Sequence, residues 1–520
     1  MSEDVSDVLF NLPDHIRDVL KPWVETSPDC VALVEGSGTW TYGQLNAAVT
    51  ETQIWLQNLG VRPGDRVMVV CENCRAFVAT VFAVVAIDAW PVLVSARLSA
   101  REVDQIRTLS GARRVIYTTS VSAQAREHAK RHSAVVEKTE WLGPIGVGAI
   151  NEGVEPEPIE AERASRVAAL IYTSGTTGIP KGVMLTHRNL LFVAAVSAKI
   201  RSLTPDDRLY GILPMSHAVG LSVVLLGTLL SGGTIYLAPL FDPVAALTTF
   251  EKHQLTIFLG APATFSLLVE YARLKGLRSL KFPALRIISS SGAPLHASLK
   301  SEVESLFGLV LHNGYGVTEC SPNIAQTRIE KPCQCVSVGK VLPGVEAQLV
   351  GTDGKSVPDG EVGELWVRGP NVMKGYYREP AATAAAINQD GWFNTCDLAQ
   401  LQDGKLFIVG RSKELIVRFG FNVYPAEVEA VLNAHPEIMR SAVLGRTLEE
   451  DGNEEVIAFI QPTSGSKLTS EQVARYAEKH LAPYKLPSQI LIVSTMPLTP
   501  TGKVVKGELK KMMAFNACPG

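Results

Sequence analysis

The sequence predicts an α/β protein, with a large N-terminal domain of α/β subdomains plus a small β subdomain, followed by a small α+β C-terminal domain. Strand-like and helix-like stretches alternate over about the first 300 residues, turn dipeptides bracket short strands from about residue 345, and a block of about 110 residues after Gly410 has a separate pattern. Such alternation is typical of a sheet with helices on its faces. We place the domain boundary near Lys413, which divides the chain into residues 1–411 and 412–520.

Short β-branched runs in the large domain predict strands at residues 65–70 (DRVMVV), 91–94 (PVLV), 113–117 (RRVIY) and 286–289 (RIIS). Two apolar stretches, residues 76–87 and 219–230, have the length of helices. Each is shorter than the roughly 18 to 20 residues that a membrane span needs, so we expect buried helices.

Turn signals mark the small β subdomain. Two Asp-Gly dipeptides, at residues 353–354 and 359–360, bracket short strands that include residues 364–367 (ELWV). This arrangement is typical of antiparallel strands joined by tight turns.

The last block contains both kinds of element. Residues 441–444 and 456–461 read as strands. Thr469 and Gln472 have the spacing of a capping box, which predicts a helix that begins there and ends near Leu481.

The composition excludes several classes of protein. With 46% apolar and 19% charged residues, the 520-residue chain is globular, and its net charge of −3 does not favour nucleic acid or an anionic membrane as a partner. The acidic N-terminus, MSEDVSDVLF, lacks the basic and apolar regions of a secretory signal. We therefore expect a cytoplasmic protein without a transmembrane segment.

The eight cysteines are scattered along the chain. Cys71 and Cys74 form a CxxC, and Cys333 and Cys335 form a CxC. A zinc site would need matching pairs or histidines at the right spacing. We expect reduced, mostly structural thiols.

One loop suggests a chemistry. The segment YTSGTTGIPKG covers residues 172–182, between a predicted strand at 167–172 and another at 183–185, after which Thr186 can cap a helix that begins near His187. Glycine and hydroxyl residues offer closely spaced N–H and O–H donors to phosphate oxygens, and Lys181 adds a positive charge. The Walker A pattern is absent, and by itself the segment could also be a flexible surface loop.

This segment resembles the signature loop of the adenylate-forming superfamily, which comprises acyl- and aryl-CoA synthetases, adenylation domains of peptide synthetases and firefly-type luciferases. Further segments resemble the family's motifs in the family's order: LPMSHAVGL (213–221), SSSGAPL (289–295), NGYGVTECSP (313–322), GELWVRGPNVMKGYY (363–377), GWFNTCDL (391–398), GRSKELIVRFGFNVYPAEVE (410–429) and PLTPTGK (497–503). The chain is most similar to a stand-alone acyl- or aryl-CoA ligase.

The resemblance implies a two-step reaction that uses ATP, Mg²⁺ and coenzyme A. A carboxylate attacks the α-phosphate of ATP to give an acyl-adenylate and pyrophosphate, and the thiol of coenzyme A then displaces AMP. The protein must chiefly position the reactants and neutralise charge on phosphorus.

The family's residue roles map onto matching positions of this chain. The β- and γ-phosphates would be held by Thr173, Ser174, Gly175, Thr176, Thr177, Gly178 and Lys181. Thr318 would donate to the α-phosphate, and Glu319 would ligate Mg²⁺. The adenosine would lie among Gly292, Ala293, Pro294, Asn313, Tyr315, Asp397 and Arg411.

Within that group the resemblance implies separate tasks. Tyr315 would offer a flat face to adenine, and Asn313 would read the adenine edge. Asp397 would accept both ribose hydroxyls, and Arg411 would add a donor to the ribose. Alone, each of these side chains would most often be a surface or packing residue, and their joint order carries the inference.

The resemblance also implies that the small C-terminal domain changes its orientation between the two steps. Lys503 would bridge the acyl carboxylate and the α-phosphate, in one domain orientation only. Lys413 occupies the position of the hinge. After the pivot, Gly420 and Asn422 would face the tunnel for coenzyme A.

The expected lining of the acyl pocket indicates the class of the acid but not which acid is used. We expect its lining to include His217, Ala218, Leu221, Thr264, Gly292, Gly314 and Val317. No acid lies between Met215 and Leu230, which argues against an amino acid, and no Arg or Lys in the lining could pair a second carboxylate. An apolar monocarboxylic acid, fatty or aromatic, is left. Leu221 stands where some long-chain relatives have a tryptophan gate.

Two other kinds of function stay open. The chain could adenylate an acid and load a carrier protein or release the adenylate, although it ends soon after Lys503 and we expect no fused carrier domain. It could also be a luciferase-like oxygenase or a non-catalytic relative. The presence of Lys181, Glu319, Asp397 and Lys503 together favours an active enzyme whose partners are a small carboxylic acid, ATP and coenzyme A.

Overall fold

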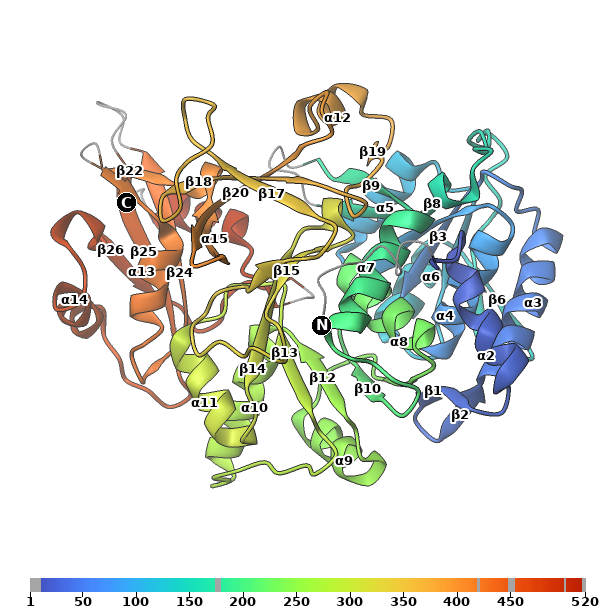
Figure 1. Ribbon diagram of the computed structural model, residues 1–520, viewed down its shortest axis with the longest axis horizontal. Helices are drawn as coiled ribbons and strands as arrows, with labels where there is room; N and C mark the ends of the chain where they lie inside the picture. Colours follow the sequence, from blue (N-terminus) through green and yellow to red (C-terminus); the bar gives the residue numbers. More distant parts are fainter. Residues whose placement is uncertain (1–10, 174–178, 419–420, 448–453, 500–501, 517–520) are drawn as a thin grey trace.

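The computed structural model describes residues 11–173, 179–418, 421–447, 454–499 and 502–516. The large domain, blue to orange in Figure 1, consists of β-sheets with helices packed on them, and the small domain, orange to red, lies beside it. The chain begins with η1 (Ile16–Leu20) and α2 (Lys21–Thr26), and the buried Ile16, Val19 and Leu20 join the main core.

The first sheet of the large domain has the strand order β19 (Gly375–Tyr376), β9 (Lys181–Thr186), β8 (Val167–Thr173), β4 (Trp90–Ser95), β3 (Arg66–Cys71), β5 (Arg114–Tyr117), β7 (Gly143–Val147), β6 (Val135–Thr139). The strands predicted at 65–70, 91–94 and 113–117 are confirmed. The pairs β8–β4, β4–β3 and β3–β5 are parallel, and burial on both faces explains their continuous apolar runs. The helices in this part of the chain are α3 (Tyr42–Asn58), α4 (Arg75–Ala86), α5 (Ala100–Ser110) and α6 (Ala123–Arg131).

The second sheet has the order β16 (Lys340–Val341), β15 (Asn323–Gln326), β14 (Leu311–Gly316), β13 (Ile287–Ser290), β12 (Ile257–Gly260), β10 (Arg208–Gly211), β11 (Thr234–Leu237), β1 (Val31–Glu35), β2 (Gly38–Thr41). The helices α9 (Pro243–His253), α10 (Pro262–Leu274) and α11 (Ala297–Phe307) lie at the lower edge of Figure 1. Because β12, β13 and β14 are parallel, their carboxyl ends meet at one edge. Ligands of open α/β sheets bind at such edges.

Apolar helices lie between the two sheets. Thr186 caps α7 (His187–Ile200) with a capping box, as expected, and most of α7 is buried. The apolar run at 219–230 is helical and buried, but it consists of a π-helix, η3 (Val219–Leu226), followed by α8 (Gly227–Leu230). The glycine at position 220 is required there, because a Cβ atom would lie 2.1 Å from the Pro214 carbonyl oxygen.

The expected small β subdomain is an antiparallel sheet of order β17 (Glu346–Val350), β18 (Val362–Arg368), β20 (Phe393–Gln402), β21 (Lys405–Arg411). The short α12 (Pro380–Ala386) precedes β20 in the chain. The last strand of this sheet ends at Arg411, so the chain leaves the large domain from the edge of the β subdomain.

The small domain begins after this strand. It contains a hairpin of β22 (Ile416–Arg418) and β23 (Phe421–Val423), a sheet of β24 (Ile438–Thr447), β25 (Glu454–Pro462) and β26 (Gln489–Ile492), and the helices α13 (Pro425–Leu432), α14 (Ser470–Glu478) and α15 (Lys506–Asn516). The strands predicted at 441–444 and 456–461 and the capping box of Thr469 and Gln472 are confirmed. Its buried apolar side chains form clusters of their own.

The cysteines correct one expectation. Cys71 and Cys74 are free and buried, and the Cys74 sulfur accepts a hydrogen bond from the N–H of Phe77 at the start of α4. Cys333 and Cys335 instead form a disulfide, because the turn between them brings their Cα atoms to 5.3 Å, so the expectation of reduced thiols is wrong for this pair.

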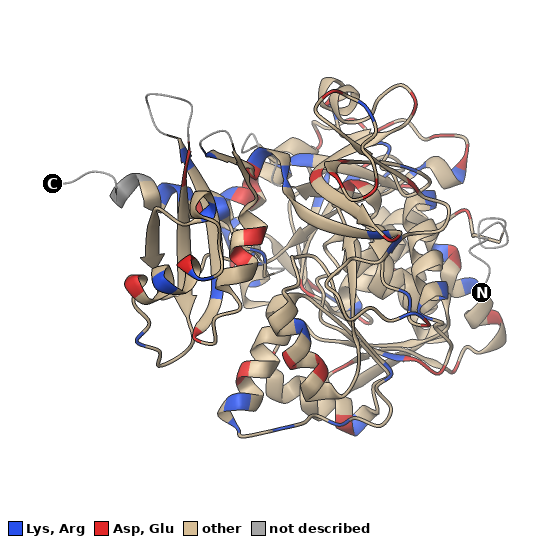
Figure 2. Cartoon of the chain, turned by 60° about the vertical axis from the view of Figure 1, so that its left-hand side comes forward, with Lys and Arg blue, Asp and Glu red and all other residues tan. Residues whose placement is uncertain are grey.

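Two kinds of feature are absent from the part of the chain that the structure describes. No helix in that part is long and apolar enough to cross a membrane, and no group of three or more His, Cys, Asp or Glu side chains is arranged to hold a metal ion. Acidic and basic residues are interspersed over both domains (Figure 2), in keeping with the small net charge.

Candidate active site

The predicted phosphate loop joins two paired strands. Ser174, Gly175, Thr176, Thr177 and Gly178 lie outside the described residues. The two ends of the loop are described: Thr173 at the end of β8 is the register partner of Lys181 at the start of β9. The hairpin thus fixes where the loop leaves and re-enters the sheet. The Lys181 ammonium nitrogen lies 5.0 Å from the ring centroid of Tyr376, which is within the range of a cation–π contact.

Tyr376 also contacts the predicted metal ligand. Its hydroxyl donates a hydrogen bond to Oε1 of Glu319 at 3.0 Å, and the Glu319 carbonyl accepts one from the N–H of Met373 at 2.8 Å. Burial raises the pKa of the Glu319 carboxyl. Sequence reasoning assigned no role to Tyr376. Its position in the matched segment GELWVRGPNVMKGYY was the available signal, but its place near Lys181 follows from the fold, where Tyr376 pairs with Val183 of β9.

The turn that carries Glu319 is unusually close-packed. Thr318 and Glu319 lie in η4 (Thr318–Cys320), directly after β14. A Cβ atom on Gly316 would lie 1.9 Å from the Pro322 carbonyl oxygen, and the N–H of Val317 donates to that same oxygen at 3.0 Å. The glycine of YGVTE is therefore needed for the turn to close. The role of Thr318 at the α-phosphate stays a prediction.

Asp397, Tyr315 and Arg411 form one hydrogen-bonded cluster. Tyr315 donates its hydroxyl to Oδ2 of Asp397 at 2.5 Å, and Nε of Arg411 donates to Oδ1 at 3.0 Å. Asp397 is only 4% exposed. Burial acts against the charge of Arg411, but Asp397 and Glu414 outweigh it and raise the pKa of the guanidinium. The predicted ribose acceptor, ribose donor and adenine platform are thus adjacent to one another.

Asn313 has structural partners of its own. Its side-chain amide donates to the carbonyl of Val336 at 3.1 Å and to that of Ser337 at 3.4 Å. Its Oδ1 accepts from the N–H of Gly314 at 3.1 Å. The side chain therefore holds the segment at Val336 in place, a contact that the sequence did not predict, and its reading of adenine stays a prediction.

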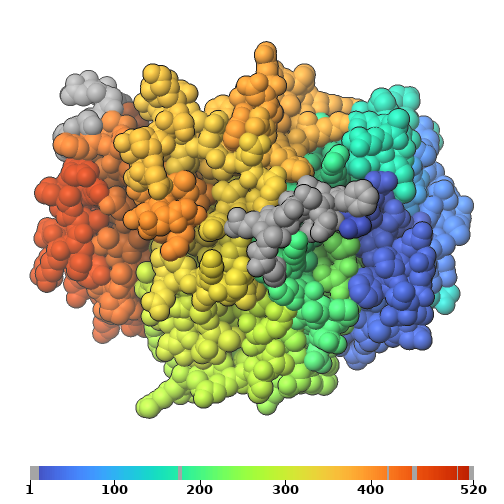
Figure 3. Space-filling view, in the orientation of Figure 1, coloured from blue at the N-terminus to red at the C-terminus, as the bar shows by residue number. Residues whose placement is uncertain are grey.

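A cavity of about 1130 Å³ lies at the junction of the two domains and contains Asn313 and the Asp397 cluster; Lys181, Thr318, Glu319 and Tyr376 are not among its described lining residues. Its lining includes the expected adenosine-site residues of the large domain and a face of the small domain; among these are Gly292, Ala293, Pro294, Asn313, Gly314, Tyr315, Val317, Asp397, Arg411, Lys413, Gly502 and Lys503. Figure 3 shows the orange and red small domain lying directly against the yellow segments of the large domain.

Lys503 reaches this cavity from a tight loop. The N–H of Lys503 donates to Oγ1 of Thr499 at 3.0 Å, and its carbonyl accepts from the N–H of Thr499 at 2.7 Å. Burial lowers the pKa of Lys503, and the nearby Arg411 acts in the same direction, against Asp397 and Glu414. A lysine in this environment is poised to attract a negatively charged ligand.

Lys506 is a further site residue that the sequence did not single out. Its ammonium binds Oε2 of Glu414 at 2.7 Å and Oε1 of Glu429 at 3.1 Å. Glu414 follows the predicted hinge Lys413 in η5 (Ser412–Glu414), so α15 is tied to the hinge segment. The hinge role of Lys413 stays a prediction.

The coenzyme A residues are only partly described. Gly420 lies outside the described residues. Asn422 is exposed on β23, where it pairs with Val417 of β22. The hairpin is therefore available at the surface of the small domain.

The predicted acyl-pocket residues divide into two groups. Gly292, Gly314 and Val317 line the cavity. His217, Ala218, Leu221 and Thr264 are not among its described lining residues, and Ala218 and Leu221 are buried in the main core. The cavity thus unites part of the expected pocket with the adenosine site but does not extend to the whole of it.

His217 lies at the start of the apolar π-helix. Within the described part of the chain its Nε2 atom is buried without a hydrogen-bond partner. Burial, with a smaller contribution from Arg97, lowers the pKa of His217 to about 4, so the ring is neutral at physiological pH. A buried polar atom without a partner costs free energy unless a ligand satisfies it.

Comparison with known proteins gives the same reading over nearly the whole chain. Residues 20–377 match the family model "AMP-binding enzyme", and residues 427–503 match "AMP-binding enzyme C-terminal domain". A feruloyl-CoA synthase of an Amycolatopsis species is 34% identical over 487 residues, which cover 93% of this chain and 96% of that protein. A 4-coumarate–CoA ligase of Oryza sativa subsp. japonica is 31% identical over 501 residues, covering 93% and 89%.

A solved structure agrees in fold. The o-succinylbenzoate coenzyme A synthetase of Bacillus subtilis, in complex with AMP, has a TM-score of 0.80 and 29% identity, and the match covers 95% of this chain and 98% of that one. The architecture described above is thus shared with an experimentally determined coenzyme A synthetase.

Gly502 provides a test of the domain contact. A Cβ atom at this position, where φ is +82°, would lie 2.7 Å from Cβ of Ala263 at the start of α10. We expect Gly502→Ala to slow pyrophosphate release from ATP by about tenfold, corresponding to about 1.4 kcal/mol, because the loop that carries Lys503 can no longer seat fully. Single-turnover kinetics would measure the rate.

Two further variants separate the clash from backbone strain. Gly465 in the small domain also has a positive φ, +78°, but a Cβ atom there meets nothing within 4 Å. Gly465→Ala should therefore lower stability by about 1 kcal/mol without slowing the reaction. Adding Ala263→Gly to Gly502→Ala should restore part of the lost rate, and a double variant as slow as Gly502→Ala would show that the contact is not responsible.

Proposed function

Since the chain belongs to the AMP-binding enzyme family and is an AMP-forming, ATP-dependent acid–coenzyme A ligase, we propose that its acid is an aromatic monocarboxylate of the phenylpropenoic type. The observation that carries this proposal is the similarity, over 93% of the chain, to a feruloyl-CoA synthase and a 4-coumarate–CoA ligase. This similarity favours an aromatic acid over a fatty acid, the two classes that the sequence left open.

The unpartnered Nε2 atom of His217 supports an aromatic acid with a polar substituent. A neutral imidazole can accept a hydrogen bond from a phenolic hydroxyl or donate one to an ether oxygen. The neighbouring Ala218 and Leu221 are buried and apolar. This combination suits a flat, mostly apolar ring with one hydrogen-bonding group better than a plain alkyl chain.

In the first step the acid's carboxylate oxygen bonds to the α-phosphorus of ATP, and the bond to pyrophosphate breaks. The loop from Thr173 to Lys181 would bind the departing phosphates. Asp397 and Arg411 would hold the ribose, and Lys503 would neutralise charge where the carboxylate and the α-phosphate meet.

Mg²⁺ fits the donor set at Glu319. Mg²⁺ is usually held by one or two carboxylates together with substrate phosphates, and Glu319 is a partly buried carboxylate that accepts a hydrogen bond from Tyr376, the residue that packs against Lys181. When bound, the ion would neutralise the charge of the phosphates. Glu319 would hold it, and Tyr376 would keep the carboxylate oriented and ionised, since its hydrogen bond lowers the pKa of Glu319 against the effect of burial.

In the second step the sulfur of coenzyme A bonds to the acyl carbon, and AMP leaves. We assign the change between steps to rotation about Lys413, between large-domain residues 1–411 and small-domain residues 412–520. The rotation would withdraw Lys503 and bring the β22–β23 hairpin, with Gly420 and Asn422, to the tunnel for coenzyme A. Loading of a carrier protein is the alternative, and AMP release that depends on coenzyme A separates the two.

The substrate proposal is tested by a pyrophosphate-release screen. We expect hydroxylated or methoxylated cinnamates to give kcat/KM values at least tenfold above those of C4 to C16 fatty acids, with AMP released only when coenzyme A is present. In His217→Ala the preference for ring-substituted over unsubstituted cinnamate should fall while the KM for ATP stays the same. A fatty acid as the best substrate would contradict the proposal.

Lys503 should act in the first step alone. Removing one charge-assisted donor from a water-poor site slows a reaction by roughly 10² to 10³. We therefore expect Lys503→Ala to slow adenylate formation by about this factor and to leave thioester formation from supplied acyl-AMP unchanged. Quenched single-turnover assays measure the two steps separately.

Lys511, on the helix α15 that follows Lys503, is the matched control, because it is exposed and pairs only with Glu508 in the described part of the chain. Lys511→Ala should alter neither step. In the unmodified enzyme the rate of adenylate formation should decrease as the pH rises. The decrease should begin before the usual pKa of lysine is reached, because burial lowers the pKa of Lys503 and its positive charge is lost at a lower pH. Equal losses in both steps would contradict the assignment.

Tyr376 should set the requirement for Mg²⁺. Tyr376→Phe keeps the ring beside Lys181 but removes the hydrogen bond to Glu319, so the carboxylate loses a fixed orientation and is protonated more readily. We expect the Mg²⁺ concentration for half-maximal rate to rise by about tenfold, since hydrogen bonds to charged groups contribute about 1.5 kcal/mol or more. Tyr377→Phe is the control, because its hydroxyl donates to Glu157 instead. An equal effect of both variants would exclude this role.

A further inference from the structure

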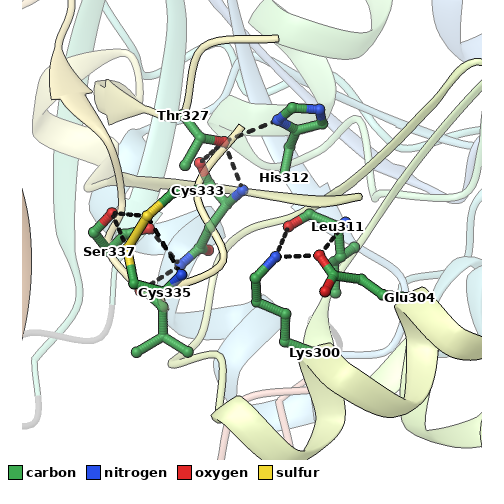
Figure 4. Close-up of a disulfide and its surroundings, with 10 residues drawn as sticks. Lys300, Glu304, Leu311, His312, Thr327, Cys333, Cys335 and Ser337 are labelled. Atoms are coloured by element: carbon green, nitrogen blue, oxygen red, sulfur yellow. Dashed lines mark hydrogen bonds and ion pairs between the residues drawn. A yellow bond between two sulfur atoms is a disulfide. The ribbon is translucent and has the colours of Figure 1, made fainter. Parts of the chain in front are cut away.

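The loop between β15 and β16 carries a disulfide that the ligase reaction does not use. Cys333 and Cys335 are bonded to one another, and Figure 4 shows the pair beside Ser337. The Ser337 hydroxyl oxygen lies 3.2 Å from the sulfur of Cys335 and 3.8 Å from that of Cys333, and Ser337 itself is fully buried. The disulfide therefore packs directly on the first buried residue of the chain that follows it.

The residues after the disulfide form a wall of the nucleotide cavity. Val336 and Val338 line the cavity, next to Asn313, Gly314 and Tyr315. The carbonyls of Val336 and Ser337 accept the two hydrogen bonds of the Asn313 side chain. The disulfide therefore restricts the movement of Val336 and Ser337, whose carbonyls hold the side chain of Asn313 in the proposed adenosine site.

The far end of the wall is fixed independently of the disulfide. The N–H of Val338 donates to the carbonyl of Leu406 at 2.9 Å, and the N–H of Leu406 donates to the carbonyl of Gly339 at 2.8 Å. A Cβ atom on Gly339 would lie 2.3 Å from the backbone of Gln326, so this end cannot shift easily. Any freedom gained by opening the disulfide is therefore confined to the stretch that holds Val336 and Ser337.

The pair is also accessible to reagents. Cys333 and Cys335 are partly exposed, and Gln334 between them is exposed. Of the free thiols in the described part of the chain, Cys71, Cys74 and Cys320 are buried, whereas Cys30 and Cys396 are exposed. Thiol–disulfide exchange needs access to a sulfur atom, which this pair has and the buried thiols lack.

We propose that Cys333 and Cys335 are a reversible dithiol–disulfide site, and that the disulfide form holds the Val336–Ser337 wall in the position that binds the adenosine part of ATP. A thiolate of an external dithiol attacks one sulfur, the bond between Cys333 and Cys335 breaks, and the second thiol of the reductant releases the mixed disulfide. The reductant becomes a cyclic disulfide, and the two cysteines gain two electrons and two protons. The proposal rests on the proposed adenosine site.

Opening the bond should weaken nucleotide binding rather than abolish it. Asn313 keeps its place on β14, where its N–H donates to Oγ1 of Thr327 and its carbonyl accepts the N–H of Thr327. Only the partners of its side chain become free to move. We therefore expect a rise of about three- to tenfold in the Kd for ATP.

The experiment measures ATP binding by titration calorimetry on the full chain, before and after treatment with dithiothreitol, and again after reoxidation with oxidised glutathione. Alkylation and mass spectrometry of the native protein report which cysteines are bonded in each sample. We expect the Kd to rise with opening of the Cys333–Cys335 bond and to return with its closure. Neither readout requires an acid substrate or turnover.

Variants identify the sulfurs responsible. C333S/C335S should have the Kd of the reduced protein and be indifferent to either reagent, while C30S, which changes an exposed thiol elsewhere, should respond like the unmodified chain. Thermal unfolding shows whether each variant is folded. The single variant C335S, which also cannot form the disulfide, should likewise have the Kd of the reduced protein. An unchanged Kd across both redox forms, or a response that persists in the folded double variant, would overturn the proposal alone. Failure of both forms to bind ATP would overturn the adenosine site itself.

Discussion

The buried carboxylate of Asp397 is the constraint on which the active site depends. A charge that is 4% exposed must be paired and hydrogen-bonded, and its partners come from separate parts of the fold: Tyr315 from the end of β14 in the second sheet, and Arg411 from the end of β21 in the β subdomain. Satisfying this one carboxylate fixes the β subdomain against the sheet. Because Arg411 directly precedes the hinge segment, the same pairing also fixes the point from which the small domain departs.

The charges around Asp397 make the cavity ready for an anion. Lys506 is compensated by Glu414 and Glu429, whose carboxylates outweigh burial and raise the pKa of its ammonium. Lys503 has no ion-pair partner in the described part of the chain, and burial lowers its pKa. A partly buried cation of this kind is destabilising until a negative group reaches it. Phosphate and carboxylate oxygens would remove that cost, so binding of ligand and seating of the small domain should favour one another.

The sequence predicts the parts of this protein that follow from local pattern. The strands at 65–70, 91–94 and 441–444, the cap at Thr186 and the capping box at Thr469 depend on neighbours in the chain, and each is confirmed. Contacts between distant segments could not be read in this way. Tyr376 lies near Lys181 only because β19 pairs with β9, and Lys506 reaches Glu414 only because α15 folds back on the start of the small domain. The Cys333–Cys335 bond is local, but the CxC spacing alone did not distinguish a disulfide from two thiols. The need for glycine at position 220, in the π-helix, likewise follows from the close approach of Pro214.

The way in which the domains meet explains how one chain can serve two steps. Among the described residues, the apolar clusters of the small domain contain no large-domain member, so no shared core locks the two together. The contacts that the structure describes between the domains include hydrogen bonds of the Asn433 side chain with His296 and of the Asn433 carbonyl with Ser298, and the packing of Gly502 against Ala263. Polar contacts exchange for contacts with water at little cost, and interfaces of this kind permit relative domain motion. In the proposed mechanism the departure of pyrophosphate would remove negative charge near Arg411 and Lys503, and the described contacts would offer little apolar resistance to a change of orientation.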